Sequence, residues 1–482
     1  MKPSGYNVFV SSFFDGWVIA YNSLWGSFFT MSEEEMRTCK AILDSLEEGE
    51  RVELSESELI HKLIEFKFII DDSVDEQMEV KNRYSRYREK SQGLSLTIAP
   101  TVSCNFRCSY CFQEPTKKRM TRENVDTIIK YIDKNLNEGN SLHITWFGGE
   151  PLLAFDVIVD LCDILHRLCK GRKCDFTQSM ITNGSLLNDK KIEFLVAEGN
   201  FKDIQITLDG PPEFHDQRRP TIGNRATFYK ILENIKRVSD KVPITIRVNI
   251  DKTNYHSVRV NIDKRNYHSL EQLVDILIDH GLRNRVHLYL GHVLPYTEAC
   301  NNLESIALAI EEFAEIESKF QFHLLQRGFL EVGSLPKPRK GNLCIADNPN
   351  GAVLAPDNLV FRCWNEVAMS SEDAVGVLED QKLKIENKYP SREKNSFASE
   401  LYQDKIMEDN NRHWNSYNPF CHEICQHCKV LPLCHGGCPW EARKNPEEAT
   451  GHCTPLKFNL PDKLRIYHMQ NTLSKVLRPD EN

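Results

Sequence analysis

Residues 94–111 read LSLTIAPTVSCNFRCSYC, so an apolar segment runs directly into a short stretch that holds three cysteines. The apolar part, Leu94–Pro100, is typical of a buried strand. The stretch after it offers the thiols of Cys104, Cys108 and Cys111. A structural zinc site normally closes with four protein ligands, so three cysteines leave one coordination position open. The pattern therefore predicts a metal-binding loop that follows a strand and keeps a vacancy for a ligand.

Downstream, apolar strands alternate with amphipathic helical stretches, which is the sequence pattern of βα units on a parallel sheet. Arg122–Leu136 is one such helix, because its apolar residues recur with a period of about 3.6. The predicted strands are Leu94–Pro100, His143–Phe147, Phe176–Thr182, Asp203–Asp209, Ile244–Ile250 and Arg285–Val293. These units predict an α/β fold with a partial (β/α)6 TIM-type barrel, whose active site forms where the strands end.

The spacing Cys-x3-Cys-x-aromatic-Cys, with Tyr110 as the aromatic residue, resembles the defining motif of the radical S-adenosylmethionine (SAM) superfamily. The resemblance implies that Cys104, Cys108 and Cys111 hold a 4Fe–4S cluster whose remaining iron binds the amino and carboxylate groups of SAM. An electron from the cluster would then cleave SAM and release a 5′-deoxyadenosyl radical. The protein's part is to hold the cofactor, to position the substrate and to exclude water. A zinc site is the alternative for these thiols.

Further motifs follow in the order that this superfamily shows. Trp146–Leu152 (WFGGEPL) resembles the GGEP segment that contacts the amino group of SAM, which implies contacts from Gly148, Gly149 and Glu150. Glycines let backbone carbonyls approach a ligand closely. The third strand ends in the tripeptide TNG, which implies a contact from Asn183.

The fourth strand reads ITLDG and continues to HDQRR, which resembles the peptide- and protein-modifying branch of the superfamily. In that branch a hydroxyl residue at the position of Thr207 contacts SAM; an ordinary β-branched strand residue is the alternative. An arginine is expected near the SAM carboxylate, because a guanidinium fork suits a carboxylate. Arg219 is the first candidate, and Arg218 and Arg225 are the alternatives.

A second group of cysteines, with the spacing Cys-x2-Cys-x5-Cys-x3-Cys, begins at Cys425. It resembles the seven-cysteine SPASM domain, which holds two auxiliary 4Fe–4S clusters. The resemblance implies two ligand sets: Cys425, Cys428, Cys434 and Cys453 for one cluster, and Cys344, Cys363 and Cys438 for the other. Asn358 stands where the family has a glycine, a mild departure because Asn tolerates a left-handed backbone. Two zinc sites are the alternative.

The second ligand set lacks an obvious fourth thiolate. Cys421 is the nearest spare cysteine and Cys300 is a more distant one; otherwise one iron stays open and is available to a substrate thiolate. The remaining cysteines show no ligand spacing, and we expect them to be packing residues: Cys39, Cys162, Cys169 and Cys174.

The composition is that of a soluble globular protein, with 482 residues, 40% hydrophobic and 27% charged. The net charge of −9, without a Lys/Arg-rich tract, argues against nucleic acid as a partner. We recognise no signal peptide and no membrane-spanning stretch, so we expect a cytoplasmic protein without a membrane partner. Sixteen cysteines in that reducing compartment favour metal binding over disulfides.

The length predicts roughly three domains. The first segment begins a helix at Ser32, which forms a capping box with Glu35. That segment resembles the leader-peptide recognition element of peptide maturases, which adds a leader as a strand to a sheet edge; a structural cap on the barrel is the alternative. The predicted boundaries are 1–75 for this winged-helix-like module, 76–93 for a linker, 94–300 for the barrel, 301–340 for a bridging region, 341–460 for the SPASM domain and 461–482 for a C-terminal helix.

One short duplication interrupts the barrel. The stretch RVNIDKTNYHSV (247–258) is followed at once by RVNIDKRNYHSL (259–270). One pair is too short for a repeat architecture, so a local duplication is the simplest interpretation. Only one copy can form the fifth strand, and the sequence does not decide which.

Taken with the resemblance, the sequence predicts a radical SAM maturase that abstracts hydrogen from a precursor peptide carrying a leader. It would install a thioether or carbon–carbon crosslink, using SAM, three 4Fe–4S clusters and an electron donor such as ferredoxin or flavodoxin. No catalytic side chain, substrate peptide or crosslink type can be predicted. An anaerobic sulfatase-maturing, formylglycine-generating enzyme is one alternative, and a zinc-dependent peptide-binding scaffold is the other.

Overall fold

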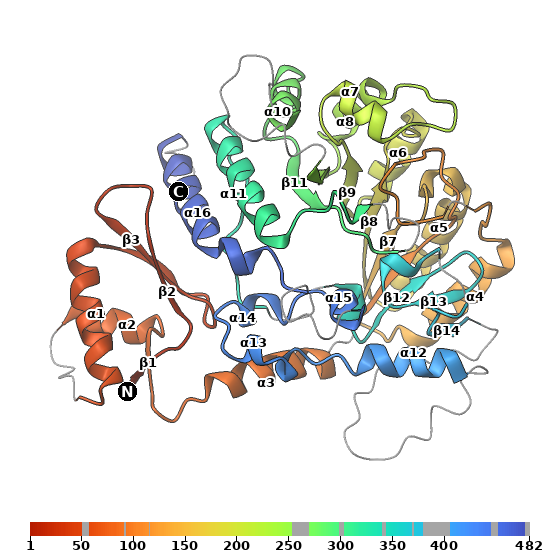
Figure 1. Cartoon of the computed structure of the whole chain (residues 1–482). Coiled ribbons are helices and arrows are strands. Elements are labelled where there is room, and N and C mark those ends of the chain that lie inside the picture. Colours follow the sequence, from red (N-terminus) through yellow and green to blue (C-terminus); the bar gives the residue numbers. More distant parts are fainter. Residues whose placement is uncertain are drawn as a thin grey trace. The chain divides into compact units, whose positions relative to one another are not determined.

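The computed structural model describes ten ranges of the chain (Figure 1): 1–50, 57–90, 93–114, 116–252, 269–297, 303–339, 344–368, 371–378, 405–444 and 452–477. The chain forms two compact units. The core unit consists of Glu89–Ala309 and Cys344–Tyr417, and the terminal unit consists of Met1–Arg88, Ile310–Leu343 and Asn418–Asn482. The domain boundaries predicted from the sequence remain a proposal.

A nine-stranded sheet organises the core unit, in the order β11-β10-β9-β8-β7-β6-β12-β13-β14. The six strands from β11, at one edge, to β6 pair in parallel in sequence order. All six were predicted: β6 Leu94–Ile98, β7 Ser141–Trp146, β8 Asp175–Thr182, β9 Phe201–Thr207, β10 Ile244–Ile250 and β11 His287–His292. The sheet then continues through three strands that were not predicted: β12 Gly351–Leu354, parallel to β6, and the antiparallel β13 Leu359–Phe361 and β14 Gly376–Val377.

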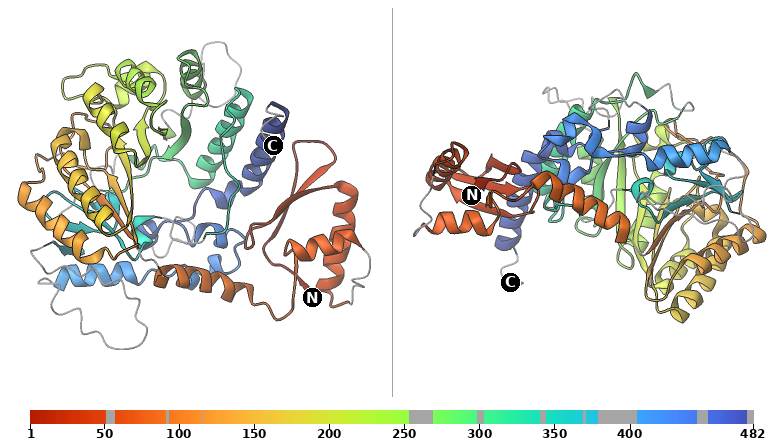
Figure 2. Two further views of the ribbon diagram at one scale, coloured as in Figure 1. Left: turned by 180° about the vertical axis from the view of Figure 1, so that it is seen from behind. Right: turned by 90° about the horizontal axis from the view of Figure 1, so that it is seen from below.

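Helices between the strands pack on the outer face of this sheet, as Figure 2 shows from two further directions. In α4 (Arg122–Asn135), Val125, Ile128 and Ile132 are buried along one face, as the predicted period requires. The other helices of the core unit are α5 Phe155–Gly171, α6 Asp189–Glu198, α7 Pro212–Arg218, α8 Phe228–Val238, α10 Ser269–Asp279 and α12 Lys405–Asn415, with short 3₁₀ turns at η1 Pro151–Ala154, η3 Ile345–Asp347 and η4 Trp364–Glu366.

The terminal unit begins with an antiparallel sheet in which β3 (Trp17–Asn22) lies between β2 (Asn7–Ser11) and β4 (Phe28–Ser32). The predicted capping box at Ser32 and Glu35 starts α1 and is confirmed. Two short strands of this unit are β1 Lys2–Pro3 and β5 Ile69–Ile70. Its helices are α1 Glu33–Glu47, α2 Glu58–Glu65, α11 Ile310–Gln326, α13 Glu423–Gln426, α14 Leu431–Cys434, α15 Pro439–Lys444 and α16 Leu456–Leu477, with a 3₁₀ turn at η5 Pro419–Cys421. All but the last two residues of α3 Glu76–Lys90 also belong to this unit. Helix α16 begins at Leu456, before the predicted residue 461.

Residues from both ends of the chain share one hydrophobic core in the terminal unit. Val10, Ile19 and Tyr21 of the first sheet pack with Leu433 and Leu464. The cysteine-rich C-terminal segment therefore packs against apolar side chains of strands β2 and β3.

The first copy of the duplication forms the end of β10, because Arg247–Ile250 are its last residues. Residues 253–268, which hold most of the second copy, lie outside the described residues. Over the described parts of the chain, no helix has both the length and the apolar character needed to cross a bilayer.

Candidate functional site

A cavity of about 320 Å³ opens where the central strands of the core unit end. It is lined by Cys104, Cys108 and Cys111 and by six of the seven residues predicted to bind the cofactor: Tyr110, Gly148, Gly149, Asn183, Thr207 and Arg219. Aromatic side chains form part of its wall, and two pairs of them are in ring contact: Phe112 with Tyr296 and Phe147 with Trp364. The sequence motifs thus converge on one hollow.

Backbone hydrogen bonds hold the cysteine loop in place. Arg107 N–H donates to the carbonyl of Pro220 at 2.7 Å, and Ser109 N–H donates to the carbonyl of Arg218 at 3.0 Å. The Phe106 N–H donates to Cys104 Sγ at 3.4 Å. These bonds attach the loop to the backbone of Arg218 and Pro220.

Burial disfavours the thiolate form of these cysteines. It raises the pKa of Cys104 to about 12 and that of Cys108 to about 11. Cys111 is exposed. A metal that binds here must displace protons, so its binding releases them.

The two glycines of the GGEP segment allow it to pack against the cysteine loop. A Cβ on Gly148, whose φ is +107°, would lie 2.2 Å from the Thr101 carbonyl oxygen. A Cβ on Gly149 would lie 2.4 Å from the Ser103 carbonyl oxygen. The amides of this segment also bond the loop, since Gly149 N–H donates to Thr101 at 3.1 Å. These glycines line the cavity, and their lack of side chains is required by the loop behind them.

Glu150 differs from the other predicted cofactor residues, because it is not among the residues that line the cavity. Its fully buried carboxylate accepts hydrogen bonds from the Thr182 hydroxyl at 2.7 Å, the Asn183 N–H at 2.8 Å and the Leu152 N–H at 3.0 Å. Burial raises the pKa of this carboxyl. The side chain ties the GGEP turn to the end of β8, so its effect on a ligand is indirect.

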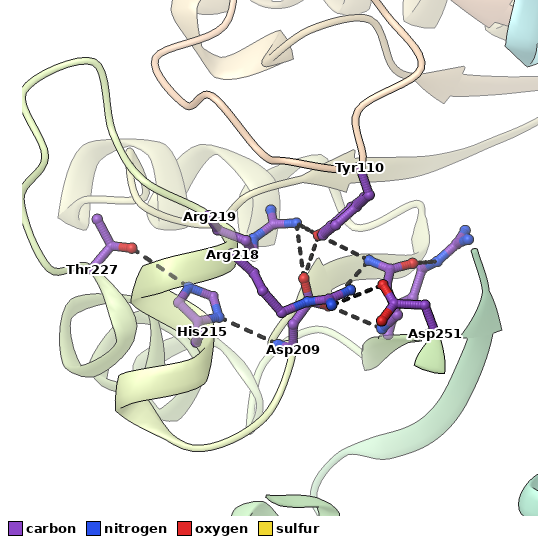
Figure 3. Close-up of polar contacts among 9 residues, drawn as sticks. Tyr110, Asp209, His215, Arg218, Arg219, Thr227 and Asp251 are labelled. Carbon is purple, nitrogen blue, oxygen red and sulfur yellow. Dashed lines mark hydrogen bonds and ion pairs between the residues drawn. The ribbon is translucent and has the colours of Figure 1, made fainter. Parts of the chain in front are cut away.

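Tyr110 connects the cysteine loop to strands β9 and β10 (Figure 3). Its hydroxyl donates to the Asp209 carboxylate and accepts from the Arg219 guanidinium. The Asn249 amide also donates to it at 3.1 Å. Arg219 lies 3.8 Å from Asp209, and both are almost fully buried. Burial raises the pKa of Tyr110 well above its ordinary value, so the phenol stays protonated.

The two alternatives to Arg219 are placed differently. Arg218 forms a buried ion pair with Asp251 at 2.8 Å, and its guanidinium lies 5.1 Å from the Tyr110 ring centroid. Arg225 is exposed and does not line the cavity. Of the three arginines, the structure brings only Arg219 to the cavity.

His215, next to this network, is neutral. Its Nδ1 accepts the Asp209 N–H at 3.3 Å, and its Nε2 lies 3.5 Å from the Thr227 hydroxyl. Burial, together with the nearby Arg219 charge, lowers its pKa to about 4. The ring therefore serves as an uncharged support for the turn after β9.

Several residues of the cavity were missed from the sequence. Arg247 and Asn249 project into it from β10, Gln205 from β9 and His292 from β11. The signal was available, because ITIRVNI places polar residues at alternate positions of an otherwise apolar strand.

In the terminal unit, a second and much smaller cavity, of about 10 Å³, is lined by the four cysteines predicted to share one auxiliary cluster: Cys425, Cys428, Cys434 and Cys453. Gly437, with φ +87°, allows the chain to close there, since a Cβ would lie 1.8 Å from the His452 carbonyl oxygen. The Lys457 ammonium donates to Cys453 Sγ at 3.7 Å. This set of four thiols fits a closed site that needs no exogenous ligand.

The other predicted ligands are divided between the units. Cys344 and Cys363 belong to the core unit, whereas Cys421 and Cys438 belong to the terminal unit. Asn358 has φ +66°, the left-handed conformation expected where the family has glycine. Cys300 lies outside the described residues. Of the predicted packing cysteines, Cys39, Cys162 and Cys169 are buried and Cys174 is partly exposed.

The predicted ligands in both cysteine regions are thiols, which are the ligands that hold iron–sulfur clusters. Among the described residues, no group of three or more His, Cys, Asp or Glu side chains is close enough to hold one metal ion. A 4Fe–4S cluster does not need that convergence, because each cysteine binds a different iron.

Comparison with known proteins agrees with this geometry. Residues 98–265 match the sequence model of the Radical SAM superfamily. The chain is 31% identical over 158 residues to GTP 3′,8-cyclase of Aliarcobacter butzleri, which covers 32% of this chain and 45% of that protein. It is 30% identical over 159 residues to the serine-type anaerobic sulfatase-maturating enzyme of Bacteroides thetaiotaomicron, covering 31% and 37%.

Two further similarities extend this result. The chain is 28% identical over 169 residues to the sporulation killing factor maturation protein SkfB of Bacillus subtilis, covering 34% of this chain and 38% of that protein. The chain thus spans less than half the length of each of these curated relatives. The solved structure of native anSMEcpe with bound AdoMet and Kp18Cys peptide is 20% identical, with a TM-score of 0.55 over 79% of this chain and 99% of that one. That similarity shows a shared fold.

Proposed function

This chain contains a radical SAM domain, and we propose that it is a peptide maturase that uses SAM to crosslink a ribosomal precursor peptide. The domain implies SAM and one 4Fe–4S cluster as cofactors. The proposal adds two auxiliary clusters, a precursor peptide with a leader, and ferredoxin or flavodoxin as the electron donor. The crosslink is a thioether or a carbon–carbon bond.

The observation that carries the proposal is the convergence of three thiols and six further motif residues on one cavity. Cys104, Cys108 and Cys111 are the ligands of the cluster that binds SAM. Asn183 and Thr207 offer polar groups at the ends of neighbouring strands, where they are suited to orient a polar cofactor.

When bound, the cluster and SAM would supply the 5′-deoxyadenosyl radical that accepts one hydrogen atom from the peptide. The second hydrogen would leave as a proton to solvent and an electron, for which the auxiliary clusters would supply the acceptor. The chain's own task is to fix the loop and to exclude water from the reaction. Tyr110 and Asp209 fix the loop against β9, and the rings of Phe112, Tyr296 and Trp364 wall the cavity with apolar surface.

The structural evidence is stronger for the first proposed auxiliary cluster than for the second. All four ligands of the first line one closed cavity in the terminal unit. For the second, the proposal assigns Cys344, Cys363 and Cys438, and either Cys421 or an open iron completes it. Iron content alone does not separate these two cases, whereas the spectrum of a Cys421→Ser variant does, because an altered fourth ligand changes the environment of that iron.

A peptide substrate is favoured by the relatives, because SkfB is named a maturation protein and the sulfatase-maturating enzyme acts on a protein. The sheet of the terminal unit has β2 and β4 as its outer strands, which suits capture of a leader by strand addition. Candidate precursor peptides from short reading frames beside the gene serve as probes. Hydrogen exchange of the amides in β2 and β4 should slow when a true leader binds.

Formylglycine formation is the second candidate, favoured by the 30% identity to the sulfatase-maturating enzyme. Mass spectrometry of the product peptide separates the two reactions. A crosslink removes two hydrogens and joins two residues, whereas formylglycine formation converts a single Ser or Cys to an aldehyde. A zinc-dependent scaffold would contain zinc and no iron after anaerobic purification.

The decisive test replaces Cys104, Cys108 and Cys111 together with Ala. We expect the reconstituted wild type to form 5′-deoxyadenosine from SAM under reducing conditions and the variant to form none. Iron bound by the terminal unit should persist in the variant, which controls for a general failure to load clusters. SAM cleavage that survives the triple replacement would refute the proposal.

A further inference from the structure

Arg247 lines the cavity from strand β10. It lies on β10 directly between Thr207 of β9 and Tyr289 of β11 in the strand register. Side chains of paired residues on neighbouring strands project from the same face of a sheet. Thr207 and Arg247 therefore form adjacent positions of one row, and both line the cavity.

Gly291 on β11 makes room for the Arg247 side chain. A Cβ built on Gly291 would lie 2.4 Å from Arg247 Nε and 2.9 Å from both Cζ and Nη2. The backbone of Gly291 does not itself require glycine, because it is not among the residues with positive φ. Its lack of a side chain is therefore explained by the guanidinium that lies against it.

The charge of Arg247 is less neutralised than that of its neighbours. Its Nε donates to the Asn249 side-chain oxygen at 2.8 Å, and its guanidinium lies 5.9 Å from the Tyr289 ring centroid. Within the described ranges no carboxylate forms an ion pair with it. Arg218, in contrast, pairs with Asp251 at 2.8 Å.

The Arg219 guanidinium also interacts with side chains of the protein itself. It donates to Tyr110 and lies 3.8 Å from Asp209, so its charge is balanced by a carboxylate of the chain. Its removal would take one hydrogen-bonding partner from the Tyr110 hydroxyl, leave Asp209 without its paired charge, and so loosen the cysteine loop. Arg219 thus has a structural reason to be an arginine that Arg247 lacks.

We propose that Arg247 binds the carboxylate of SAM, in the space that Gly291 leaves for it and beside the Thr207 hydroxyl. Arg219, the first candidate from the sequence, then acts as a positioning residue for Tyr110 and Asp209. This inference rests on the proposed function, because it takes SAM as the ligand of the cavity. A guanidinium fork matches a carboxylate with two parallel hydrogen bonds, and such charge-assisted bonds are the stronger ones.

The test compares equilibrium binding of SAM and decarboxylated SAM to the anaerobically reconstituted full chain. Losing one charged hydrogen-bonding partner should weaken SAM binding by roughly 10- to 100-fold in Arg247→Gln. Binding of decarboxylated SAM should be unchanged by that replacement. Arg247→Lys, which keeps the charge, should recover part of the SAM affinity. Iron content of each variant verifies that the clusters are loaded.

Three further variants sharpen the result. Gly291→Ala leaves the arginine in the chain but displaces it, so it should weaken SAM binding in the same ligand-selective way. Arg219→Gln should weaken both ligands alike, because it loosens the loop. Arg225→Gln, an exposed arginine outside the cavity, is the matched control and should bind both ligands as the wild type does.

The outcomes separate the two levels of the proposal. A wild type with full iron that binds no SAM contradicts the proposed function itself. A wild type that binds SAM, with Arg247→Gln binding it equally well, overturns the inference alone. So does a lysine variant no better than the glutamine variant, or a carboxylate-selective loss found in Arg219→Gln instead.

Discussion

The two cysteine regions of this chain are built in opposite ways. The loop with Cys104, Cys108 and Cys111 borders an open cavity of about 320 Å³, and backbone hydrogen bonds and the side chain of Tyr110 hold it. The four cysteines from Cys425 to Cys453 surround a cavity of only about 10 Å³, among short helices. An open site with a rigid frame suits a cofactor that must come and go. A closed site with four thiols suits a cluster that stays.

The difference also concerns what each proposed cluster would contribute to folding. The first loop follows a strand of a nine-stranded sheet, so the core unit has a hydrophobic core that needs no metal. The second region consists of helices as short as Glu423–Gln426 and Leu431–Cys434, which are too short to be stable alone. Bound metal contributes folding free energy in such segments.

Serine replacements in the two regions should therefore have unequal effects on stability, and this is the largest effect expected. If the proposed auxiliary cluster is bound there, Cys434→Ser should remove roughly four irons per chain and destabilise the terminal unit, because α14 would lose its metal ligand. Cys108→Ser should abolish SAM cleavage while the core unit stays folded. Iron analysis and hydrogen exchange of peptides from each unit measure both effects.

Cys39→Ser provides the matched control for Cys434→Ser. Cys39 and Cys434 are both buried and lie in the same unit, but Cys39 lines neither cavity. It should cost packing free energy and keep all iron. Full iron retention in Cys434→Ser would show that the closed site is not a cluster site.

Two glycines allow a second comparison. Gly148 and Gly437 both have positive φ, and a Cβ on either would lie too close to a carbonyl oxygen, 2.2 Å and 1.8 Å away. Replacement with Ala should cost about 2 to 5 kcal/mol of stability in each case, from backbone strain and overpacking together. Gly437→Ala should also lose auxiliary iron, whereas Gly148→Ala should weaken SAM binding with iron retained at the terminal unit.

Gly281 controls for the backbone strain alone. Its φ is +71°, and a Cβ there would meet nothing within 4 Å. Gly281→Ala should cost about 1 kcal/mol and change neither iron nor SAM binding. Thermal unfolding with iron analysis distinguishes the three variants. Equal losses of stability in all three would show that the close approach of the carbonyl oxygen to these glycines matters at neither site.

Acid should weaken the hydrogen-bonded support of the open site through His215. Its pKa is lowered to about 4 in the folded protein, against about 6.5 for an unperturbed histidine, so the unfolded chain binds more protons between these values. The stabilisation is complete above about pH 6.5 and is lost as the pH falls toward 4, by about 3 kcal/mol in total. Hydrogen exchange of α7 and β9 between pH 7 and 5, corrected for intrinsic rates, should show it.

His215→Asn should flatten that pH dependence, because an amide oxygen can still accept the Asp209 N–H but does not titrate. His61, an exposed histidine of α2 in the terminal unit, provides the control through His61→Asn, which should leave the hydrogen exchange of α7 and β9 as in the wild type. A variant at His215 that keeps the wild-type slope would place the titrating group elsewhere.

The sequence predicted the open site better than its surroundings. The six parallel strands were recognised because each is an apolar run followed by an amphipathic helix, and the motifs located most of the cavity. Strands β13 and β14 were missed because they span only Leu359–Phe361 and Gly376–Val377, too short to show a period. Their pairing depends on contacts with distant residues.

Side-chain roles within the site were less predictable than positions. Glu150 lies in the expected motif, yet its carboxylate turns toward Thr182 and Asn183 because three donors meet there. No local pattern encodes that meeting. Arg247 carried a readable signal, a charged residue alternating with apolar ones in a central strand, but its partner Gly291 lies on another strand, and only the fold brings the two together.

The smallest effect is expected from removing one copy of the duplication. Deleting residues 253–264 joins Lys252 to Arg265 and leaves a single RVNIDKRNYHSL, so β10 keeps Arg247, Asn249 and Asp251 and α10 keeps its start at Ser269. Because β10 and α10 both stay complete, the sheet that frames the open site keeps its strands, and stability should change little. SAM affinity and the unfolding temperature should match the wild type. A large loss in either would mean that the second copy supports the site, and the contrast between a sheet-framed site and a metal-framed one would then hold only for strands β6 to β9.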